Sequence, residues 1–342
     1  MRVLVIKTSS LGDVIHTLPA VTDAAARIAG IRFDWVVEES FAEIPAWHPA
    51  VERVLPVALR RWRKNPWRAW RSGDWSGFRR ALSQYRYDRV IDAQGLLKSA
   101  FITRFADGPS YGLDRQSARE PLASRFYDHP LPVTKGRHAI ERTRSLFAQV
   151  LDYELGGEPL NYGLDPSRLP ESPYPSPYLV YLHGTTWLSK HYPETHWQRL
   201  VALAEDAGYR VLLPWGNPEE RQRAQRLAAT RKTVEVLPAL ELSRLAGVLA
   251  GAAGVVGVDT GLAHLASALE RPGVFLYGPT DVTLTGVAGP AQRAMQADLD
   301  CVPCLKRRCS RPEASAGEPV CLQRIDPEVV FSALQEFIPP AL

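Results

Sequence analysis

Residues 1 to 19 read Met1-Arg-Val-Leu-Val-Ile-Lys7-Thr8-Ser9-Ser10-Leu11-Gly12-Asp13-Val-Ile-His16-Thr17-Leu18-Pro19. The apolar run Val3 to Ile6 is too short for a helix and does not alternate, so it predicts a buried parallel strand. In open α/β sheets, ligands bind beyond the carboxyl ends of such strands, where helix N-termini offer free N–H groups. Asp13 therefore lies where α/β enzymes place their chemistry, although a helix-capping role would also explain it.

Length and composition describe an ordinary globular protein. The chain has 342 residues, which predicts two domains, and its apolar content of 45% and charged content of 23% are unremarkable. No stretch reaches the roughly 20 apolar residues of a membrane span, and no signal peptide is visible at the N-terminus. We therefore expect a cytoplasmic protein.

Strand-like and helix-like segments alternate in two series. The first series predicts strands at 3–6, 32–37, 53–57 and 89–92, and helices at 14–28, 75–85 and 138–151. Residues 163–177 contain five prolines and predict a linker. The second series predicts strands at 178–182, 210–213, 254–258 and 273–277, and helices at 194–208, 219–229, 241–252 and 260–269. The fold class is therefore α/β, with Rossmann-like parallel-sheet domains at 1–162 and 178–342.

Two loops of the second domain have features of phosphate sites. Val258-Asp-Thr-Gly-Leu-Ala-His264 follows a strand and opens a helix, where the positive helix end favours an anion. In His183-Gly-Thr-Thr-Trp-Leu-Ser-Lys190, small residues allow close backbone approach and Lys190 offers a point charge. Each loop alone could be a tight turn. Together they favour a nucleotide diphosphate.

Other cofactor and metal motifs are weak. No Gly-x-Gly-x-x-Gly follows a strand, and no P-loop motif occurs. The pair Asp298 and Asp300 follows no apparent core strand, which argues against a metal site there. The cysteines Cys301, Cys304, Cys309 and Cys321 could close a zinc site, but their spacing departs from paired Cys-x2-Cys motifs, and unligated thiols are the favoured interpretation.

The net charge is +4, and cations gather in residues 60–71, which hold six cations, three tryptophans and no acid. This mixture suits a membrane interface or a polyanionic ligand. A solvated basic loop with its tryptophans tucked under remains the alternative.

Seven segments, spread over nearly the whole chain, carry a resemblance to one protein family. They are residues 7–13, 33–39, 60–64, 92–95, 118–123, 214–216 and 258–264. They resemble the motifs of the bacterial lipopolysaccharide heptosyltransferases, most closely those that add the first heptose to Kdo-lipid A. The resemblance implies a GT-B architecture, in which two Rossmann-like domains face each other across a cleft. The first would bind the acceptor and the second ADP-heptose.

The same resemblance implies roles for individual residues. Asp13 matches the base that takes the acceptor proton in an inverting transfer. The residues implied at the donor site are Thr185, Thr186 and Lys190 at the diphosphate, Glu220 at the adenosine, and Asp259, Thr260, Gly261 and His264 around the diphosphate and heptose. The residues implied at the acceptor site are Arg60, Arg61, Arg63, Lys64, Arg119, His138 and Arg142. Kdo carboxylates and lipid A phosphates require such a cationic lining.

The implied partners are ADP-heptose and Kdo-lipid A, with peripheral contact to the inner face of the inner membrane and no nucleic acid. Lys190 and the helix start at Thr260 can stabilise the departing ADP, so we expect no metal and no cofactor. The cysteine-containing tail resembles that of heptosyltransferases that add the second heptose, which keeps that reaction as an alternative. A nucleotide-sugar epimerase would not need the cations at 60–71, and a lipid-binding or nucleic-acid-binding module would leave Asp13 and Lys190 unexplained.

Overall fold

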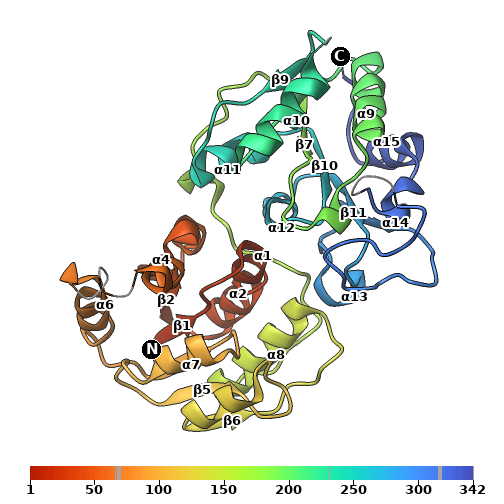
Figure 1. Ribbon diagram of the computed structural model, residues 1–342. Coiled ribbons are helices and arrows are strands. Elements are labelled where there is room, and N and C mark those ends of the chain that lie inside the picture. Colours follow the sequence, from red (N-terminus) through yellow and green to blue (C-terminus); the bar gives the residue numbers. More distant parts are fainter. Residues whose placement is uncertain (66, 68–70, 230, 315–317, 342) are drawn as a thin grey trace. The chain divides into compact units, whose positions relative to one another are not determined.

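The computed structural model describes residues 1–65, 67, 71–229, 231–314 and 318–341. It divides into two compact units, Met1–Asp165 and Pro166–Leu342. Each unit contains one six-stranded parallel sheet with helices between the strands (Figure 1). The prediction of an α/β protein with two Rossmann-like sheets is confirmed.

The sheet of unit 1 has the strand order β3-β2-β1-β4-β5-β6. Its strands are β1 (Arg2–Ile6), β2 (Arg32–Glu38), β3 (Val51–Val57), β4 (Arg89–Asp92), β5 (Ser110–Leu113) and β6 (His129–Leu131). Its helices are α1 (Leu11–Ile15), α2 (Leu18–Arg27), α3 (Glu43–Ala46), α4 (Leu59–Lys64), α6 (Asp74–Leu82), α7 (Leu97–Thr103) and α8 (Ala139–Leu151), with 3₁₀ turns η1 (Glu39–Phe41) and η2 (Pro121–Phe126).

Strand β1 lies at the centre of this sheet because both of its faces are apolar. Val3 to Ile6 are fully buried. Leu4 and Ile6 belong to a core cluster with Phe78 of α6 and Ile102 of α7. This arrangement explains why the run Val3 to Ile6 shows no alternation of polar and apolar residues.

The sheet of unit 2 repeats the topology, with the order β12-β11-β10-β7-β8-β9. Its strands are β7 (Tyr178–Leu182), β8 (Arg210–Leu213), β9 (Val234–Val236), β10 (Gly254–Val258), β11 (Gly273–Tyr277) and β12 (Gln292–Gln296). Its helices are α9 (Glu194–Asp206), α10 (Pro218–Ala228), α11 (Leu242–Ala250), α12 (Gly261–Ala268), α13 (Val282–Thr285), α14 (Val320–Gln323) and α15 (Pro327–Gln335), with 3₁₀ turns η3 (Pro166–Arg168) and η4 (Leu188–Lys190).

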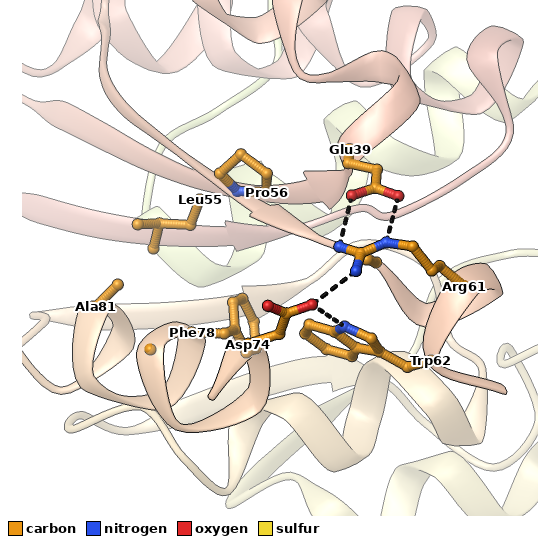
Figure 2. A pocket seen from close by; sticks show the side chains of 10 residues that line it. Glu39, Leu55, Pro56, Arg61, Trp62, Asp74, Phe78 and Ala81 are labelled. Carbon is orange, nitrogen blue, oxygen red and sulfur yellow. Dashed lines mark hydrogen bonds and ion pairs between the residues drawn. The ribbon is translucent and has the colours of Figure 1, made fainter. Parts of the chain in front are cut away.

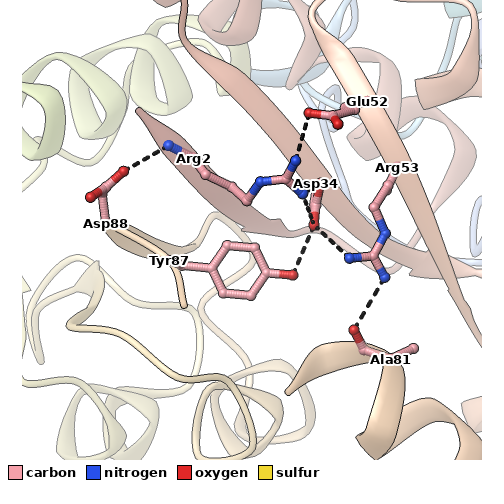
Figure 3. Close-up of polar contacts among 7 residues, drawn as sticks. All are labelled: Arg2, Asp34, Glu52, Arg53, Ala81, Tyr87 and Asp88. Carbon is pink, nitrogen blue, oxygen red and sulfur yellow. Dashed lines mark hydrogen bonds and ion pairs between the residues drawn. The ribbon is translucent and has the colours of Figure 1, made fainter. Parts of the chain in front are cut away.

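A buried charge network braces the sheet of unit 1 at its amino-terminal strand ends (Figure 3). The carboxylate of Asp34 is fully buried and accepts hydrogen bonds from Arg2 at 3.2 Å, Arg53 at 3.3 Å and the Tyr87 hydroxyl at 2.9 Å. Arg2 also pairs with Glu52 at 2.7 Å. Because parallel strands place their functional loops at the opposite edge, this network has a structural role.

Some predicted elements differ from the structure. The single helix predicted at 14–28 is two helices, α1 and α2, because Pro19 lies in the first turn of a new helix. Four short strands, β5, β6, β9 and β12, were not predicted. The helix predicted at 75–85 ends at Leu82.

Candidate active site

Both sheets have the same topological switch point. In unit 1 it lies between β1 and β4, and in unit 2 between β7 and β10. Consecutive connections leave such a pair of strands toward opposite sides of the sheet, which opens a crevice at their carboxyl ends. The loops after these four strands carry Asp13, Gln94, Lys190 and Asp259.

Asp13 lies in α1, directly after β1, and is half-buried. One carboxylate oxygen accepts the Ser10 N–H at 2.6 Å and the Ser10 hydroxyl at 2.8 Å. Asp13 therefore contributes to capping α1, although as the N3 residue of a capping box whose N-cap is Ser10 and not as the N-cap itself. The contacts occupy Oδ2, so a capping role is compatible with a chemical role for Oδ1.

The loop that leads to Asp13 is held by Gln94, which follows β4. The Gln94 side-chain oxygen accepts the Thr8 N–H at 2.8 Å and the Thr8 hydroxyl at 2.7 Å. Its amide nitrogen donates to the Ser9 carbonyl at 2.8 Å. One side chain thus joins the loops that follow the two strands at the switch point.

Beneath this loop lie two buried ionisable side chains, Lys7 and Asp92. The Lys7 ammonium donates to the Ala93 carbonyl at 2.8 Å, and burial lowers its pKa while the carboxylates of Asp13 and Asp92 oppose that effect. Burial raises the pKa of Asp92, which accepts hydrogen bonds from Tyr127 at 2.7 Å and Ser99 at 2.9 Å. These buried hydrogen bonds hold the strand ends on which the Asp13 loop rests.

Three predicted acceptor residues lie around the same end of the sheet. The charges of Arg119 and Arg142 both act on Lys7, which places them near the Asp13 loop. His138 caps α8, where its Nδ1 accepts the Ile140 N–H at 3.2 Å, and its ring meets that of His16 at 5.4 Å. Arg142 donates to the Ser117 carbonyl at 2.7 Å. The structure therefore brings Asp13, Arg119, His138 and Arg142 to one edge of unit 1.

The cations of α4 divide into two groups. Arg61 is bound within unit 1, since it makes a two-pronged contact with Glu39 at 3.1 and 3.2 Å and pairs with Asp74 at 2.6 Å (Figure 2). The hydrogen bonds to these carboxylates raise the pKa of Arg61. Arg60, Arg63 and Lys64 are exposed. Arg68 and Trp70 of the predicted basic cluster lie outside the described residues.

The tryptophans of this segment behave differently from one another. Trp62 packs against Trp75 at 5.7 Å and Phe78 at 5.9 Å between ring centroids, whereas Trp67 is 75% exposed. Trp62 and Arg61 line an open pocket of about 400 Å³ with Glu39, Asp74 and Phe78 (Figure 2). The interpretation that the rings are tucked under therefore describes Trp62 and not Trp67.

In unit 2, the loops after β7 and β10 meet through a salt bridge. The Lys190 ammonium lies 2.6 Å from Asp259 Oδ2, and both side chains are mostly buried. The Thr185 hydroxyl donates to the Asp259 carbonyl at 3.1 Å, and Thr280 also donates to the Asp259 carboxylate. The ammonium lies 4.7 Å from the centroid of the Trp187 ring. An anionic ligand would meet a lysine already held in place.

The other predicted donor residues lie in the loop after β7 or on the helices α10 and α12 of the same unit. Thr260 is the N-cap of α12, in extended conformation, and Gly261 opens the helix. His264 is buried one turn further along α12, and Thr186 is exposed. The Glu220 carboxylate accepts the Gly216 N–H at 2.8 Å and lies so close to Gly184 that an added Cβ there would sit 2.5 Å from it.

Arg223 of α10 holds the two ends of the loop after β7. One guanidinium nitrogen donates to the His183 carbonyl at 3.1 Å and to His191 Nδ1 at 2.7 Å. Burial, with the nearby Arg223 charge, lowers the pKa of His183 to about 3 and of His191 to about 4. Both imidazoles are therefore neutral at pH 7, so that His191 can accept the hydrogen bond.

Within the described ranges, no three His, Cys, Asp or Glu side chains are grouped so that they could hold a metal ion. All four cysteines are unpaired with one another. Burial raises the pKa of the Cys321 thiol to about 11, with the neighbouring Cys309 and Cys304 adding to the effect.

Among the described helices, none is long and apolar enough to cross a membrane.

Comparison with known proteins identifies the family. The model of glycosyltransferase family 9 (heptosyltransferase) matches residues 75–314. This chain belongs to glycosyltransferase family 9. The lipopolysaccharide heptosyltransferase 1 of Pseudomonas aeruginosa is 54% identical to it over 99% of this chain and 98% of the relative, and that of Escherichia coli K12 is 53% identical over 87% of this chain and 94% of the relative.

Solved structures agree with the assignment of this chain to glycosyltransferase family 9. The E. coli heptosyltransferase WaaC with ADP has a TM-score of 0.88 and 47% identity, covering 98% of this chain and 99% of that one. The same enzyme with ADP-2-deoxy-2-fluoro heptose has a TM-score of 0.83. Heptosyltransferase 2 of E. coli is only 25% identical over 83% of this chain. The prediction of a glycosyltransferase of lipopolysaccharide biosynthesis, with the type 1 resemblance, is confirmed.

Sequence reasoning assigned no role to three side chains that hold the loops of this candidate site: Gln94, which lies in the noted segment 92–95, Arg223 and Thr280. Gln94 and Thr280 follow the strands β4 and β11, so the rule that places ligands at carboxyl strand ends could have drawn attention to them. Arg223 lies inside a helix rich in charged residues. Its spacing of three from Glu220 was the one available signal.

Proposed function

We propose that this chain moves a heptose from ADP-heptose to Kdo-lipid A, with inversion at the anomeric carbon. Unit 1 would bind the acceptor and unit 2 the nucleotide sugar. The observation that carries the proposal is the pair of switch-point sites, one with a carboxylate on a clamped loop and one with a buried lysine at a helix start. The relatives that are more than half identical are type 1 enzymes, which favours the first heptose over the second.

In this mechanism Asp13 takes the proton of the acceptor hydroxyl as that oxygen attacks the anomeric carbon. Oδ2 is held by Ser10, which leaves Oδ1 to accept the proton. The charge of the buried Lys7 ammonium interacts with this carboxylate. A positioned base of this kind contributes about 10² to 10⁴-fold to the rate.

As the bond to the sugar breaks, negative charge develops on the diphosphate of ADP. Lys190 lies where it can neutralise that charge, together with the N–H groups at the start of α12 and the hydroxyls of Thr185, Thr186 and Thr260. In the free protein Asp259 holds Lys190, so the phosphate would compete with Asp259 for the ammonium. Glu220, next to Gly216, would accept hydrogen bonds from the adenosine.

The acceptor is proposed to bind through Arg60, Arg63, Lys64, Arg119, His138 and Arg142. The arginines and the lysine among them match the carboxylates and phosphates of Kdo-lipid A. Arg61 is proposed to act differently, because Glu39 and Asp74 already neutralise it. It would hold α4 in place for its neighbours. A lipid acceptor also implies peripheral contact with the inner face of the inner membrane.

The test is to measure ADP release from ADP-heptose with and without Kdo-lipid A. We expect release that depends on the acceptor. An epimerase would release no ADP, and release that does not depend on Kdo-lipid A would contradict the acceptor assignment.

We also expect activity to survive EDTA, because in the proposed mechanism Lys190 and the start of α12 stabilise the departing ADP. Loss of activity that added Mg²⁺ restores would refute that account.

A further inference from the structure

Three large apolar side chains of unit 1 are exposed on two adjoining elements. Leu97 and Phe101 of α7 are 39% and 49% exposed, and Leu122 of η2 is 55% exposed. Leu97 and Phe101 are four residues apart, so they share one face of the helix. We name Leu97, Phe101 and Leu122 the α7 patch.

The α7 patch belongs to a well-packed part of the unit. The Leu97 N–H donates to the Glu120 carboxylate at 2.6 Å, and the rings of Phe101 and Phe126 meet at 6.4 Å. Ala100, on the inner face of α7, packs in a buried cluster with Ala123 and Tyr127. The exposure of the patch is therefore a property of an ordered surface.

A chain of aromatic rings joins the α7 patch to α4. Phe101 meets Phe105 at 5.0 Å, Phe105 meets Trp75 at 5.1 Å, and Trp75 meets Trp62 of α4 at 5.7 Å between centroids. The patch is thus continuous, through packed rings, with the helix that carries the exposed acceptor cations. In Figure 1, α4, α6 and α7 belong to the red and orange part of unit 1.

Exposed cations accompany the apolar side chains. They are Arg60, Arg63 and Lys64 of α4, Lys98 of α7, Arg104 directly after α7, and Arg125 of η2. Burial lowers the pKa of Lys98, the nearby carboxylate of Glu38 opposes this effect, and the charges of Arg60 and Arg63 add to it. Carboxylates near these elements include Glu39 and Asp74, which both pair with Arg61, and Glu120 and Asp128, which accept hydrogen bonds from the Leu97 N–H and from Ser110. Positive charge therefore predominates.

Apolar side chains bordered by cations are the composition of a surface that lies at a membrane interface. Lysine and arginine keep their charged ends among lipid headgroups while apolar side chains enter the acyl region. We propose that the α7 patch docks unit 1 on an anionic lipid surface, with Phe101 and Leu122 inserted. The inference rests on the proposed function, which requires a lipid acceptor, and adds the face that meets the lipid.

The docked face is joined to the reacting loop. The Lys98 ammonium, beside Leu97, donates to the Ser9 hydroxyl at 3.0 Å. Ser9 is in turn held by Gln94 and precedes the Ser10 cap of Asp13. Docking through α7 would therefore place Asp13 close to the sugar headgroup of a lipid acceptor, without extraction of its acyl chains.

The test compares the variant Phe101→Ser with Leu122→Ser against a control, Leu305→Ser with Val329→Ser. The control residues are 64% and 57% exposed and lie in unit 2. Binding of the purified proteins to vesicles of phosphatidylglycerol and phosphatidylethanolamine is measured by sedimentation, with phosphatidylcholine vesicles for comparison. Thermal unfolding checks that both variants keep the wild-type fold.

We expect wild type and control to bind the anionic vesicles and to bind phosphatidylcholine more weakly. The α7-patch variant should bind the anionic vesicles about tenfold less, because two inserted side chains are lost. Wild-type protein that ignores the vesicles, or equal losses in both variants, would overturn the proposal. A wild-type dimer that the patch variant converts to monomer would also overturn it, because the patch would then join two copies.

Kinetics separate this inference from the proposed function. With a deacylated, water-soluble Kdo acceptor, kcat/KM of the patch variant should stay within twofold of wild type. With Kdo-lipid A in vesicles it should fall about tenfold. Equal losses on both acceptors would refute a docking role. Vesicle binding needs no turnover, so an enzyme that binds vesicles but does not use Kdo acceptors would count against the proposed function alone.

Discussion

At the scale of single residues, Gln94 shows how the loop that leads to Asp13 is held. Gln94→Ala removes hydrogen bonds to Thr8 and Ser9, so the loop that carries Asp13 loses its link to β4. We expect kcat to fall between about 10-fold and 100-fold, since small misplacements of reacting groups have effects of this size. The KM for ADP-heptose should change little, because the proposed donor site lies in unit 2.

Gln149→Ala is the matched control for this prediction. Gln149 is an exposed glutamine of α8 that donates to the Pro132 carbonyl at 3.0 Å. It should leave kcat unchanged. Gln94→Glu keeps the acceptor for Thr8 but loses the donor to Ser9, so its kcat should lie between those of wild type and Gln94→Ala. A wild-type kcat for Gln94→Ala would contradict the positioning role.

At the scale of elements, α4 carries cations that are proposed to bind the acceptor, together with Arg61, which pairs with Glu39 and Asp74. Arg63→Ala with Lys64→Ala should raise the acceptor KM about threefold to tenfold and leave the donor KM unchanged, because exposed charge pairs are individually weak. The increase should shrink as salt rises. Initial rates at varied acceptor and donor concentrations measure both constants.

Arg80→Ala with Arg86→Ala removes two exposed arginines of the same unit and serves as the control. It should leave both constants unchanged. If the α4 variant raised both Michaelis constants equally, α4 would support the fold and not the acceptor site. An unchanged acceptor KM would identify α4 as a solvated surface.

The elements that the sequence predicted are those whose own residues determine their burial. Val3 to Ile6 and Tyr178 to Leu182 are apolar on both faces and lie at the centres of their sheets. The missed strand β12, Gln292–Gln296, is half-buried along its length, and β6 is mostly exposed and contains Pro130. Such edge strands exist because a neighbouring strand pairs with them, and that partner lies far away in sequence.

The site was predicted in the same uneven way. The positions of Asp13, Lys190 and Asp259 could be predicted because each lies in a loop or helix start that follows a recognisable strand. The contacts of Gln94 with Thr8 and Ser9, more than eighty residues away, depend on the pairing of β1 with β4. The neutralisation of Arg61 by Glu39 and Asp74 likewise depends on tertiary contacts, which residue spacing does not show.

At the scale of the whole molecule, the buried histidines make stability depend on pH. His183 and His191 have pKa values lowered to about 3 and about 4 in the folded protein, against 6.5 when exposed. The unfolded chain therefore binds more protons between these values. The contribution of these two histidines to the free energy of unfolding is therefore largest above about pH 6.5 and declines as pH falls toward 4. The His183 contribution alone is about 2 kcal/mol between pH 7 and pH 5.

Urea unfolding at pH 7 and pH 5 measures this dependence. The wild-type protein should lose stability at pH 5, and His183→Asn should show a smaller loss between the two pH values. His129→Asn, which changes an exposed imidazole of unit 1, should keep the wild-type loss. If His183→Asn showed the same pH dependence as wild type, His183 would not be the proton-sensitive group.

The most direct test of the whole account is a mass spectrum of the acceptor after reaction with ADP-heptose and Kdo-lipid A. We predict that the wild-type protein adds the mass of one heptose residue. Asp13→Asn should still bind ADP but produce about 10² to 10⁴-fold less product per unit time. No mass gain with wild type, a gain only on an acceptor that already carries one heptose, or near-normal product with Asp13→Asn would contradict the account.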